Sequence, residues 1–386
     1  MSDGYPGLPD ERMTLGLGRP HADDGRAAGV TSPIGPTDAV AVFADLGAYG
    51  IDVGDDDLVA PGASSGERAA VVARFTRALD TAGIVVPAVT ADLSSHPAFA
   101  DGAFTAAEPT VRRAALRKAI DAIDLGAELG AELVVLDGGA ELATNEAAKD
   151  VPTALDCYSE AVKACCAYVE DRGYDVELAL ALPRDAMGPA LLPTVGHVLA
   201  FVAQLEQPSI VGVDAVLGPD GPGPPFHVEV AHALWADKLF RVDLGGLPDP
   251  GLGPEGAWGS RALRDAFFAV ALLEEAEWTG IRHLAAGPAA RDLGELRTQA
   301  QGRIGTYLLL RAKVAELVGD PEIADARAAA GAERLAERTL PDGPSPESFA
   351  VLRDEALDLS APTTDARDRL DRLVTRLIVG DDRREA

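Results

Sequence analysis

Acidic side chains that could do chemistry follow several short apolar runs of the sequence. Carboxylates in such positions can bind a cation or a polyol, or they can accept hydrogen bonds from backbone N–H groups of a following helix. The capping role is favoured for the set, and Asp137 and Asp243 are the strongest candidates for a ligand site. The eight residues are Asp55, Asp56, Asp57, Asp92, Asp137, Asp214, Asp220 and Asp243.

Three basic side chains stand in comparable positions. His96 and His283 follow apolar runs, where a histidine can act as a general acid or base. Arg184 lies near the end of another run, where its fixed charge could hold a carboxylate or a phosphate. The simpler alternatives, which we favour, are a packing role for the two histidines and a surface ion pair for Arg184.

The charge balance excludes whole classes of partner. Acidic residues outnumber basic ones by 62 to 34, which gives a formal net charge of −28. Such a surface repels phosphate backbones and anionic lipid, so we expect no nucleic-acid partner and no membrane partner. The start of the sequence shows no secretory signal, and the longest uncharged stretch, 186–205, contains proline and glycine. We therefore expect a cytoplasmic protein.

The three cysteines fall in one expected helix, without the spacing of a zinc site or a disulfide framework. They are Cys157, Cys165 and Cys166. We interpret them as small apolar residues in a reducing compartment.

These side chains must be positioned by a repeating pattern of strands and helices. Apolar runs suited to buried parallel strands occur at 13–18, 49–54, 83–92, 132–139, 176–183, 210–218, 239–246 and 281–287. Helical periodicity occupies 38–48, 67–82, 111–129, 151–172, 194–205, 228–236, 261–277 and 293–317. The first turn, GLGRPHADDG, lacks the glycine order of a dinucleotide-binding open sheet. The pattern therefore predicts an α/β fold, a (β/α)₈ TIM barrel over residues 10–318.

The remaining segment, 319–386, contains no further strand pattern. It reads as three charged amphipathic helices at 321–339, 346–359 and 364–380. So short a segment cannot bury a core of its own, so we expect a helical arm that docks on the barrel or on another subunit.

Several stretches resemble xylose isomerase of the actinobacterial type. They include DLGAYGIDVGDDDL, HPAFADGAFTA, VRRAALRKAIDAIDLGAELGAE, LLPTVGHVLAF and HALWADKLFRVDL, and the similarity runs from about residue 10 to 320. The resemblance implies a barrel whose arm clasps a neighbour in a homotetramer. It also implies two divalent cations, such as Mg²⁺ or Mn²⁺, that assist a hydride shift between an aldose and a ketose.

This sequence departs from the family pattern at most of its functional positions. The seven positions that hold metal in the family carry Ala181, Val216, Pro219, Asp243, Gly253, Glu255 and Ala285. Only Asp243 and Glu255 keep a carboxylate, so we regard them as vestigial ligands and expect no bound Mg²⁺ or Mn²⁺. Other pocket positions carry Gly18, Gly54, Ser94 and Asp137, while Asp57 is kept. Whether Pro183 or Arg184 takes the position of the family lysine stays open.

Three functions stay open on this evidence. The favoured one is a non-catalytic pseudoenzyme with a degenerate metal site, which binds a partner or a small polar ligand; an active isomerase subunit is one conceivable partner. The alternative is a repurposed isomerase, epimerase or lyase, metal-independent or with a single metal, that acts on a small polar or sugar-like substrate. Its candidate residues are Asp57, Asp137, His96, Arg184 and His283. Weak residual sugar isomerisation is the third. We expect no cofactor and a homodimer or homotetramer.

Overall fold

The structure is a computed structural model of the 386-residue chain. It describes residues 12–17, 34–138, 141, 149–183, 190–216, 224–245, 262–286, 290–340, 342–355 and 364–380. These residues form two compact units, Met1–Tyr307 and Leu308–Ala386. The two units are described separately.

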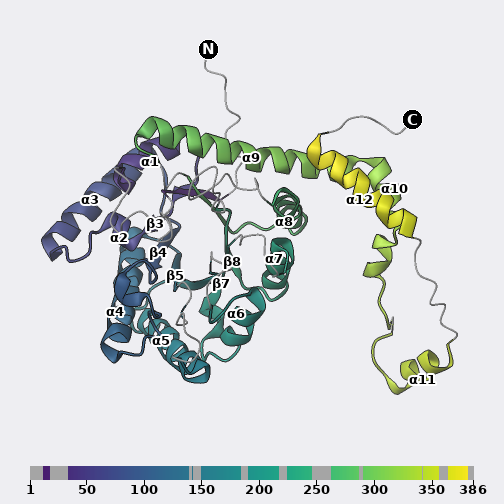
Figure 1. Ribbon diagram of the computed structural model, residues 1–386, viewed down its shortest axis with the longest axis horizontal. Helices are drawn as coiled ribbons and strands as arrows, with labels where there is room; N and C mark the ends of the chain where they lie inside the picture. The colour runs from purple at the N-terminus through teal and green to yellow at the C-terminus, as the bar shows by residue number, and fades with distance from the viewer. Residues whose placement is uncertain are drawn as a thin grey trace, which may run out of the picture. The chain divides into compact units, whose positions relative to one another are not determined.

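The first unit is a barrel of parallel strands (Figure 1). Its described strands are β1 (Met13–Gly16), β2 (Gly50–Ile51), β3 (Val53–Gly54), β4 (Ala88–Asp92), β5 (Leu133–Asp137), β6 (Glu177–Ala181), β7 (Val211–Val216), β8 (Leu239–Asp243) and β9 (Ile281–Ala285). The strand order is β2-β1-β9-β8-β7-β6-β5-β4-β3. The two outermost strands, β2 and β3, are separated in the chain by Asp52 alone, so the sheet closes on itself. The predicted TIM barrel is therefore confirmed.

The barrel closes through a break at Asp52. The sequence predicts one strand over 49–54, and the structure divides it into β2 and β3, with Asp52 between them. Strand β2 pairs with β1, whereas β3 pairs with β4. The Asp52 backbone N–H donates to the carbonyl of Leu15, and that of Ile51 donates to Val85. The break thus lets one short segment serve both edges of the sheet.

Helices surround the strands, as the periodicity predicts (Figure 1). They are α1 (Pro36–Asp45), α2 (Asp55–Leu58), α3 (Ser65–Ala82), α4 (Pro109–Leu129), α5 (Val151–Arg172), α6 (Val195–Val202), α7 (Phe226–Trp235) and α8 (Leu263–Glu275). Local chemistry fixes several ends: Ser64 and Glu67 form a capping box before α3, and Gly83 ends that helix at φ 71°. The short helix α2 and the 3₁₀ helix η1 (Pro97–Phe99) lie in stretches where we predicted no helix.

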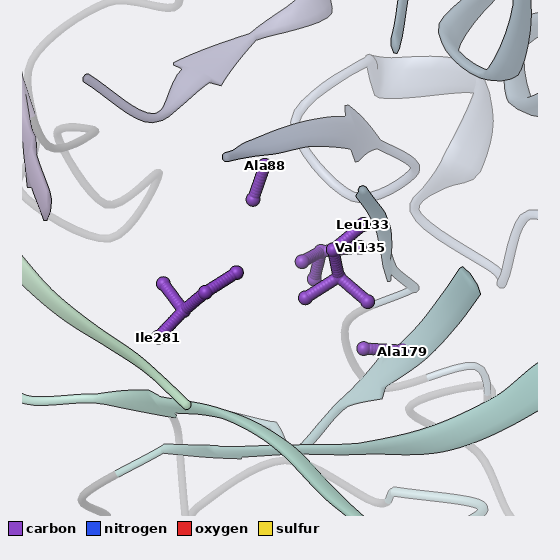
Figure 2. Packing of buried hydrophobic residues seen from close by; sticks show 5 residues of the cluster. All are labelled: Ala88, Leu133, Val135, Ala179 and Ile281. Carbon is purple, nitrogen blue, oxygen red and sulfur yellow. The ribbon is translucent and has the colours of Figure 1, made fainter. Parts of the chain in front are cut away.

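Small and branched apolar side chains fill the amino-terminal part of the barrel interior. Ala88, Leu133, Val135, Ala179 and Ile281 form one buried cluster, and Figure 2 shows them gathered in the barrel interior from strands β4, β5, β6 and β9. Phe240 packs against this cluster at a register shift between β7 and β8. A Cβ atom at Gly212 would come within 2.4 Å of the Phe240 ring, so only glycine fits beside it. This layer is dry and apolar, and it forms the floor beneath the polar residues described below.

The second unit is helical. The boundary between the units falls inside α9 (Leu293–Gly319), and α10 (Pro321–Ala329), the 3₁₀ helix η4 (Ala332–Ala336), α11 (Pro346–Asp354) and α12 (Thr364–Val379) follow it. Helices α10 and α12 pack on each other through buried residues that include Ile323 and Leu373. The domain limits 10–318 and 319–386 that the sequence suggests stay a prediction.

The part of the second unit that follows Asp320, called the tail below, exposes large apolar side chains. Leu335 is 91% exposed, and Val351 and Val379 are 69% and 67% exposed. Phe349 and Leu352 on α11 are also exposed. No helix among the described residues is both long enough and apolar enough to cross a membrane.

Candidate functional site

A layer of charged side chains lies above the apolar floor of the barrel. Arg241 on β8 is in register with Asp214 on β7 and with Ile281, a member of the floor cluster, on β9. Because parallel neighbours in register point to the same face of a sheet, Arg241 and Asp214 project into the barrel. His283 lies two residues beyond Ile281 and pairs with Thr14 on β1, so these side chains face inward as well.

The Arg241 guanidinium lies among three buried carboxylates. Its Nε and Nη2 lie 3.0 and 2.8 Å from the two carboxylate oxygens of Asp214, which is a bidentate pairing. Its Nη1 lies 3.0 Å from Asp52 Oδ2, and its Nη2 lies 3.6 Å from Asp243 Oδ2. Asp243 Oδ1 also accepts the backbone N–H of Gly245. One cation thus joins strands β7 and β8 and the break between β2 and β3.

His283 and Asp52 form a dyad beside this guanidinium. The imidazole Nδ1 lies 3.0 Å from Asp52 Oδ2 and 3.3 Å from the hydroxyl of Thr14. The ring lies against Gly16, where a Cβ atom would come within 2.6 Å of Cε1 and 3.2 Å of Nε2. The side chain of His283 keeps 8% of its surface exposed and that of Asp52 keeps 3%. Nε2 makes no hydrogen bond to a described residue, so it is the nitrogen left for a ligand.

The charges in this layer determine which groups are ionised. Burial opposes ionisation of Asp52, but the charges and hydrogen bonds of His283 and the charge of Arg241 overcome it and lower the pKa of Asp52. Burial also disfavours the charged form of Arg241, but Asp214, Asp52 and Asp243 outweigh it and raise the pKa of the guanidinium. The layer therefore holds ionised carboxylates and a permanent cation. Taking charges out of water is costly unless they pair, and here the pairing is extensive.

The residues at the carboxyl ends of the strands do not fit the metal centre that the resemblance implies. Ala181 and Ala285 end β6 and β9, Val216 ends β7, and none of the three side chains can bind a cation. The surviving carboxylate Asp243 already pairs with Arg241. Across the described ranges, no three His, Cys, Asp or Glu side chains are grouped so that they could hold a metal ion. We therefore derive no chemical step through a bound metal.

Comparisons with known proteins give the same fold. Residues 40–213 match the family model described as a xylose isomerase-like TIM barrel. Together with the strands described above, the match shows a TIM-barrel fold, and this part of the chain is similar to that family. The match bears out the resemblance at that coarse level and does not extend to the actinobacterial type.

Solved structures with this fold include two sugar epimerases. D-psicose 3-epimerase from Clostridium cellulolyticum H10, solved with D-tagatose, is 14% identical, with 78% of this chain and 99% of that chain covered and a TM-score of 0.54. The 3-keto-D-glucoside 4-epimerase from E. coli is 12% identical over 78% and 99%, with a TM-score of 0.53. A xylose isomerase-like TIM barrel protein from Mycobacterium smegmatis, solved in complex with magnesium, is 16% identical over 78% and 98%, with a TM-score of 0.51. At these identities the likeness is one of fold.

Within this barrel fold, the predicted candidates have different surroundings. His283 and Asp243 lie in the central layer, and Asp137 is half-buried at the end of β5. Asp57 is exposed on α2. His96 is exposed too, and its Nδ1 accepts the backbone N–H of Ala98 at the start of η1. Arg184 and Glu255 lie outside the described residues, as do Pro219 and Gly253.

The acidic set divides between structural and interior roles. Asp92 Oδ1 accepts the backbone N–H groups of Ser94 and Ser95, which is the type of backbone contact that the capping interpretation expects. Asp55 pairs with Lys118 of α4 at 2.8 Å and accepts the backbone N–H of Asp92. Asp214 and Asp243 instead serve the buried layer. Asp220 lies outside the described residues.

Sequence reasoning missed Thr14, Asp52 and Arg241. A signal for them was present, because Asp52 and Arg241 are charged residues in the middle of apolar runs predicted to be buried. A charge in such a run has to be paired, and each such charge therefore points to another. We searched for chemistry only at the ends of the runs, where active sites of TIM barrels usually lie.

Proposed function

We propose that this chain is a metal-independent isomerase or epimerase that acts on a small hydroxylated, sugar-like substrate. The contact between His283 Nδ1 and Asp52 Oδ2, 3.0 Å, carries the proposal. The xylose isomerase-like barrel fold and the epimerases among its solved relatives support the reaction class by analogy.

The dyad has the arrangement of an oriented general acid–base. A carboxylate that accepts from Nδ1–H fixes the tautomer of a neutral imidazole and leaves Nε2 able to take up a proton. His283 Nε2 would remove a proton from the carbon next to a substrate carbonyl, and the bonding electrons would form an enediolate with its negative charge on the former carbonyl oxygen. Returning the proton to the former carbonyl carbon, while the hydroxyl proton passes to the former carbonyl oxygen, isomerises the sugar. Protonation of the original carbon by water on its opposite face epimerises it, and His283 then releases its proton to solvent. Neither route needs an oxidant or a second substrate.

The proposal is metal-independent because of the residues at the strand ends. In the actinobacterial type of xylose isomerase that the sequence resembles, carboxylates and a histidine hold two cations, and we propose that this chain has lost that centre. Ala181, Val216 and Ala285 support this assignment, since none of them offers an oxygen or nitrogen ligand from its side chain. The three cysteines are free thiols, two of them buried and Cys157 half-buried, which supports our proposal of a reducing, cytoplasmic setting.

Solvent exchange tests the proposal directly. The intact protein is incubated with ketopentoses and ketohexoses in D₂O containing EDTA, and ¹H NMR follows deuterium entry at the carbons beside the carbonyl. We expect incorporation with at least one sugar, and a loss of 10²-fold or more in His283→Gln. His96→Gln is the matched control, because that histidine is exposed and caps η1. No exchange with any sugar, or equal exchange in His283→Gln, contradicts the proposal.

A non-catalytic, ligand-binding pseudoenzyme is the second candidate. One observation favours it: Arg241 already pairs with Asp214, Asp52 and Asp243, so its guanidinium is engaged by the protein's own carboxylates. On this account the same sugars raise the melting temperature but exchange no deuterium. A thermal melt beside the exchange assay therefore separates the two functions.

We also propose that the chain assembles with copies of itself, as a homodimer or homotetramer, through its helical tail. The exposed Leu335, Phe349 and Val351 support this, because water-exposed apolar side chains grouped on short helices are typical of contact surfaces. Co-assembly with an active isomerase subunit would use the same side chains.

A further inference from the structure

A buried glutamate follows β5 at the carboxyl end of the barrel. Glu141 comes shortly after Asp137, the last residue of β5, and it is 4% exposed. Its Oε1 accepts the backbone N–H of Phe104 at 3.2 Å. Its Oε2 accepts the backbone N–H of Thr105 at 3.1 Å and the Thr105 hydroxyl at 2.7 Å. The carboxylate thus binds donors of the connection between η1 and α4.

Two glycines leave room for this carboxylate. Gly102 has φ 95°, a conformation that favours glycine, and a Cβ atom there would come within 2.3 Å of Thr105 Oγ1 and 2.9 Å of Glu141 Oε2. A Cβ atom at Gly138 would come within 3.0 Å of Glu141 Oε1. The backbone therefore encloses the carboxylate on two sides.

The backbone of Glu141 joins this connection to two others. Lys149, directly before the N-cap residue of α5, donates from Nζ to the Glu141 carbonyl at 3.0 Å and to Thr105 Oγ1 at 2.9 Å. Lys149 also donates to the carbonyl of Asp101. Glu141 in turn pairs with Ala190, which follows β6, in an isolated antiparallel bridge. One residue thus links segments that follow β4, β5 and β6, at the face where TIM barrels bind their substrates.

The position that Glu141 occupies is costly for the chain. Its φ of 52° lies in the left-handed region, which a residue with a side chain rarely adopts. Burial raises the pKa of Glu141, against the opposing effect of its hydrogen bonds to Thr105 and Phe104. Strain and dehydration therefore favour release of this residue, while the hydrogen bonds hold it in place. Strained residues held in this way are typical of clamps and switches.

We infer that Glu141 is a clasp, which holds the segment 101–106 and the segment at Ala190 together at the mouth of the barrel, and that both segments open when it is released. The closed clasp limits the access of water to the barrel interior, and the open one admits a ligand. The inference is independent of the reaction proposed above, because the clasp contains none of the residues paired with Arg241.

Hydrogen–deuterium exchange of the full-length protein, followed by mass spectrometry, tests the clasp. Glu141→Gln keeps the shape of the side chain and removes its charge, so we expect the amides of Phe104 and Thr105 to exchange about tenfold faster or more. We expect the amides of 190–192 to accelerate by a similar factor. This second effect identifies a clasp, because that segment pairs with the backbone of Glu141.

The control is Asp265→Asn. The Asp265 carboxylate also accepts a backbone N–H from another segment, that of Phe226 at 3.0 Å, and it joins α8 to the start of α7. We expect exchange at Phe104, Thr105 and 190–192 to stay within about twofold of wild type in this variant. Equal acceleration in Asp265→Asn and Glu141→Gln contradicts a local clasp.

Faster exchange at Phe104 and Thr105 with wild-type exchange over 190–192 overturns the inference, since Glu141 would then serve one connection only. Unchanged exchange in both segments overturns it as well.

Lys149→Met decides the case in which Glu141→Gln does not fold. It leaves the carboxylate and removes the ammonium that holds the Glu141 carbonyl, so we expect exchange in both segments to accelerate about threefold or more. Wild-type exchange over 190–192 in Lys149→Met overturns the inference.

Discussion

The barrel buries several charged side chains, whereas the tail exposes several large apolar ones. Inside the barrel, Arg241, Asp52 and Asp214 are buried and paired with one another. In the tail, Leu335 and Val351 are largely exposed, and the ion pair of Arg369 with Glu322 lies on the surface. The barrel thus holds a buried group of charged side chains, and the tail has solvent-exposed apolar side chains.

This difference reflects how many neighbours each unit can offer to a charged or an apolar side chain. The closed barrel brings together strands from distant parts of the chain, so that the buried Arg241 meets the carboxylates of Asp214 and Asp52 within the same unit. The tail has too few residues to cover all of its apolar side chains, and the buried apolar residues among its described ones, such as Ile323 and Leu373, lie on α10 and α12. The exposed apolar side chains of the tail are the observation on which the proposed self-assembly rests.

Removing the tail gives the largest expected effect on this comparison. Deletion of the residues after Asp320 should convert an assembly into monomers or insoluble protein, because α10, α11 and α12 are lost together. Light scattering of the intact chain should give a multiple of 40.0 kDa. A stable monomer of the intact chain would contradict the assembly, and the tail would then have no need of a second copy.

Breaking the two arginine pairs should give very different losses of stability. Arg241→Met leaves buried carboxylates without their cation, so we expect the free energy of unfolding to fall by about 3–5 kcal/mol. Arg369→Met breaks an ion pair whose side chains are 45% and 41% exposed, so the fall should stay below about 1 kcal/mol. Urea unfolding measures both losses. Similar values would contradict the expectation that the buried ion pairs of Arg241 contribute more to stability than the exposed pair of Arg369.

Acid should act on the barrel through Asp52. The pKa of this carboxyl is lowered in the folded protein, so its contribution is fully present above the unfolded pKa and is lost as pH falls below 3.8 toward the folded value. Asp52→Asn removes up to one titrating proton, which should flatten the acid limb of the stability curve by up to about 1.4 kcal/mol per pH unit. Asp365→Asn, on α12 in the tail, is the control. Equal slopes in wild type and Asp52→Asn between pH 2 and 4 would contradict this.

Point changes on the tail should have the smallest effect on folding. Val351→Ser alters a side chain that is 69% exposed, so we expect the free energy of unfolding at low protein concentration to change by less than about 0.5 kcal/mol. The same change should weaken self-association, which analytical ultracentrifugation measures. A large loss of stability without any change in association would place Val351 in a packed core instead of a contact surface.

Local pattern predicts most of the fold. The eight expected apolar runs all contain strands, and α5 has the bounds Val151–Arg172 that its periodicity predicts. Errors occur at ends and interruptions: the strand over 49–54 is broken at Asp52, and the helix over 321–339 becomes α10 and η4. Both concern where an element stops, which depends on neighbours in space as well as on periodicity.

The sequence analysis identified some residues of the candidate site and missed others. His283 and Asp243 were identified as candidates by their positions at strand ends, whereas Asp57 and His96 were chosen by the same rule and lie exposed. The rule places a residue at the right end of the barrel but does not tell whether its side chain points inward. Asp57 lies on α2 and His96 directly before η1, beyond the ends of the strands, so the alternation of side chains along a strand does not turn them into the barrel.

The sequence by itself therefore determined the elements, their order and the barrel that they form, because apolar periodicity and helix caps act over a few residues. Only the tertiary structure decided which charges meet. Asp52 and Arg241 are 189 residues apart, and Thr14 and His283 are 269 apart. Closure of the barrel brings these segments together in one register, so that the buried guanidinium of Arg241 meets the carboxylates of Asp214 and Asp52, which offset part of the cost of burying its charge.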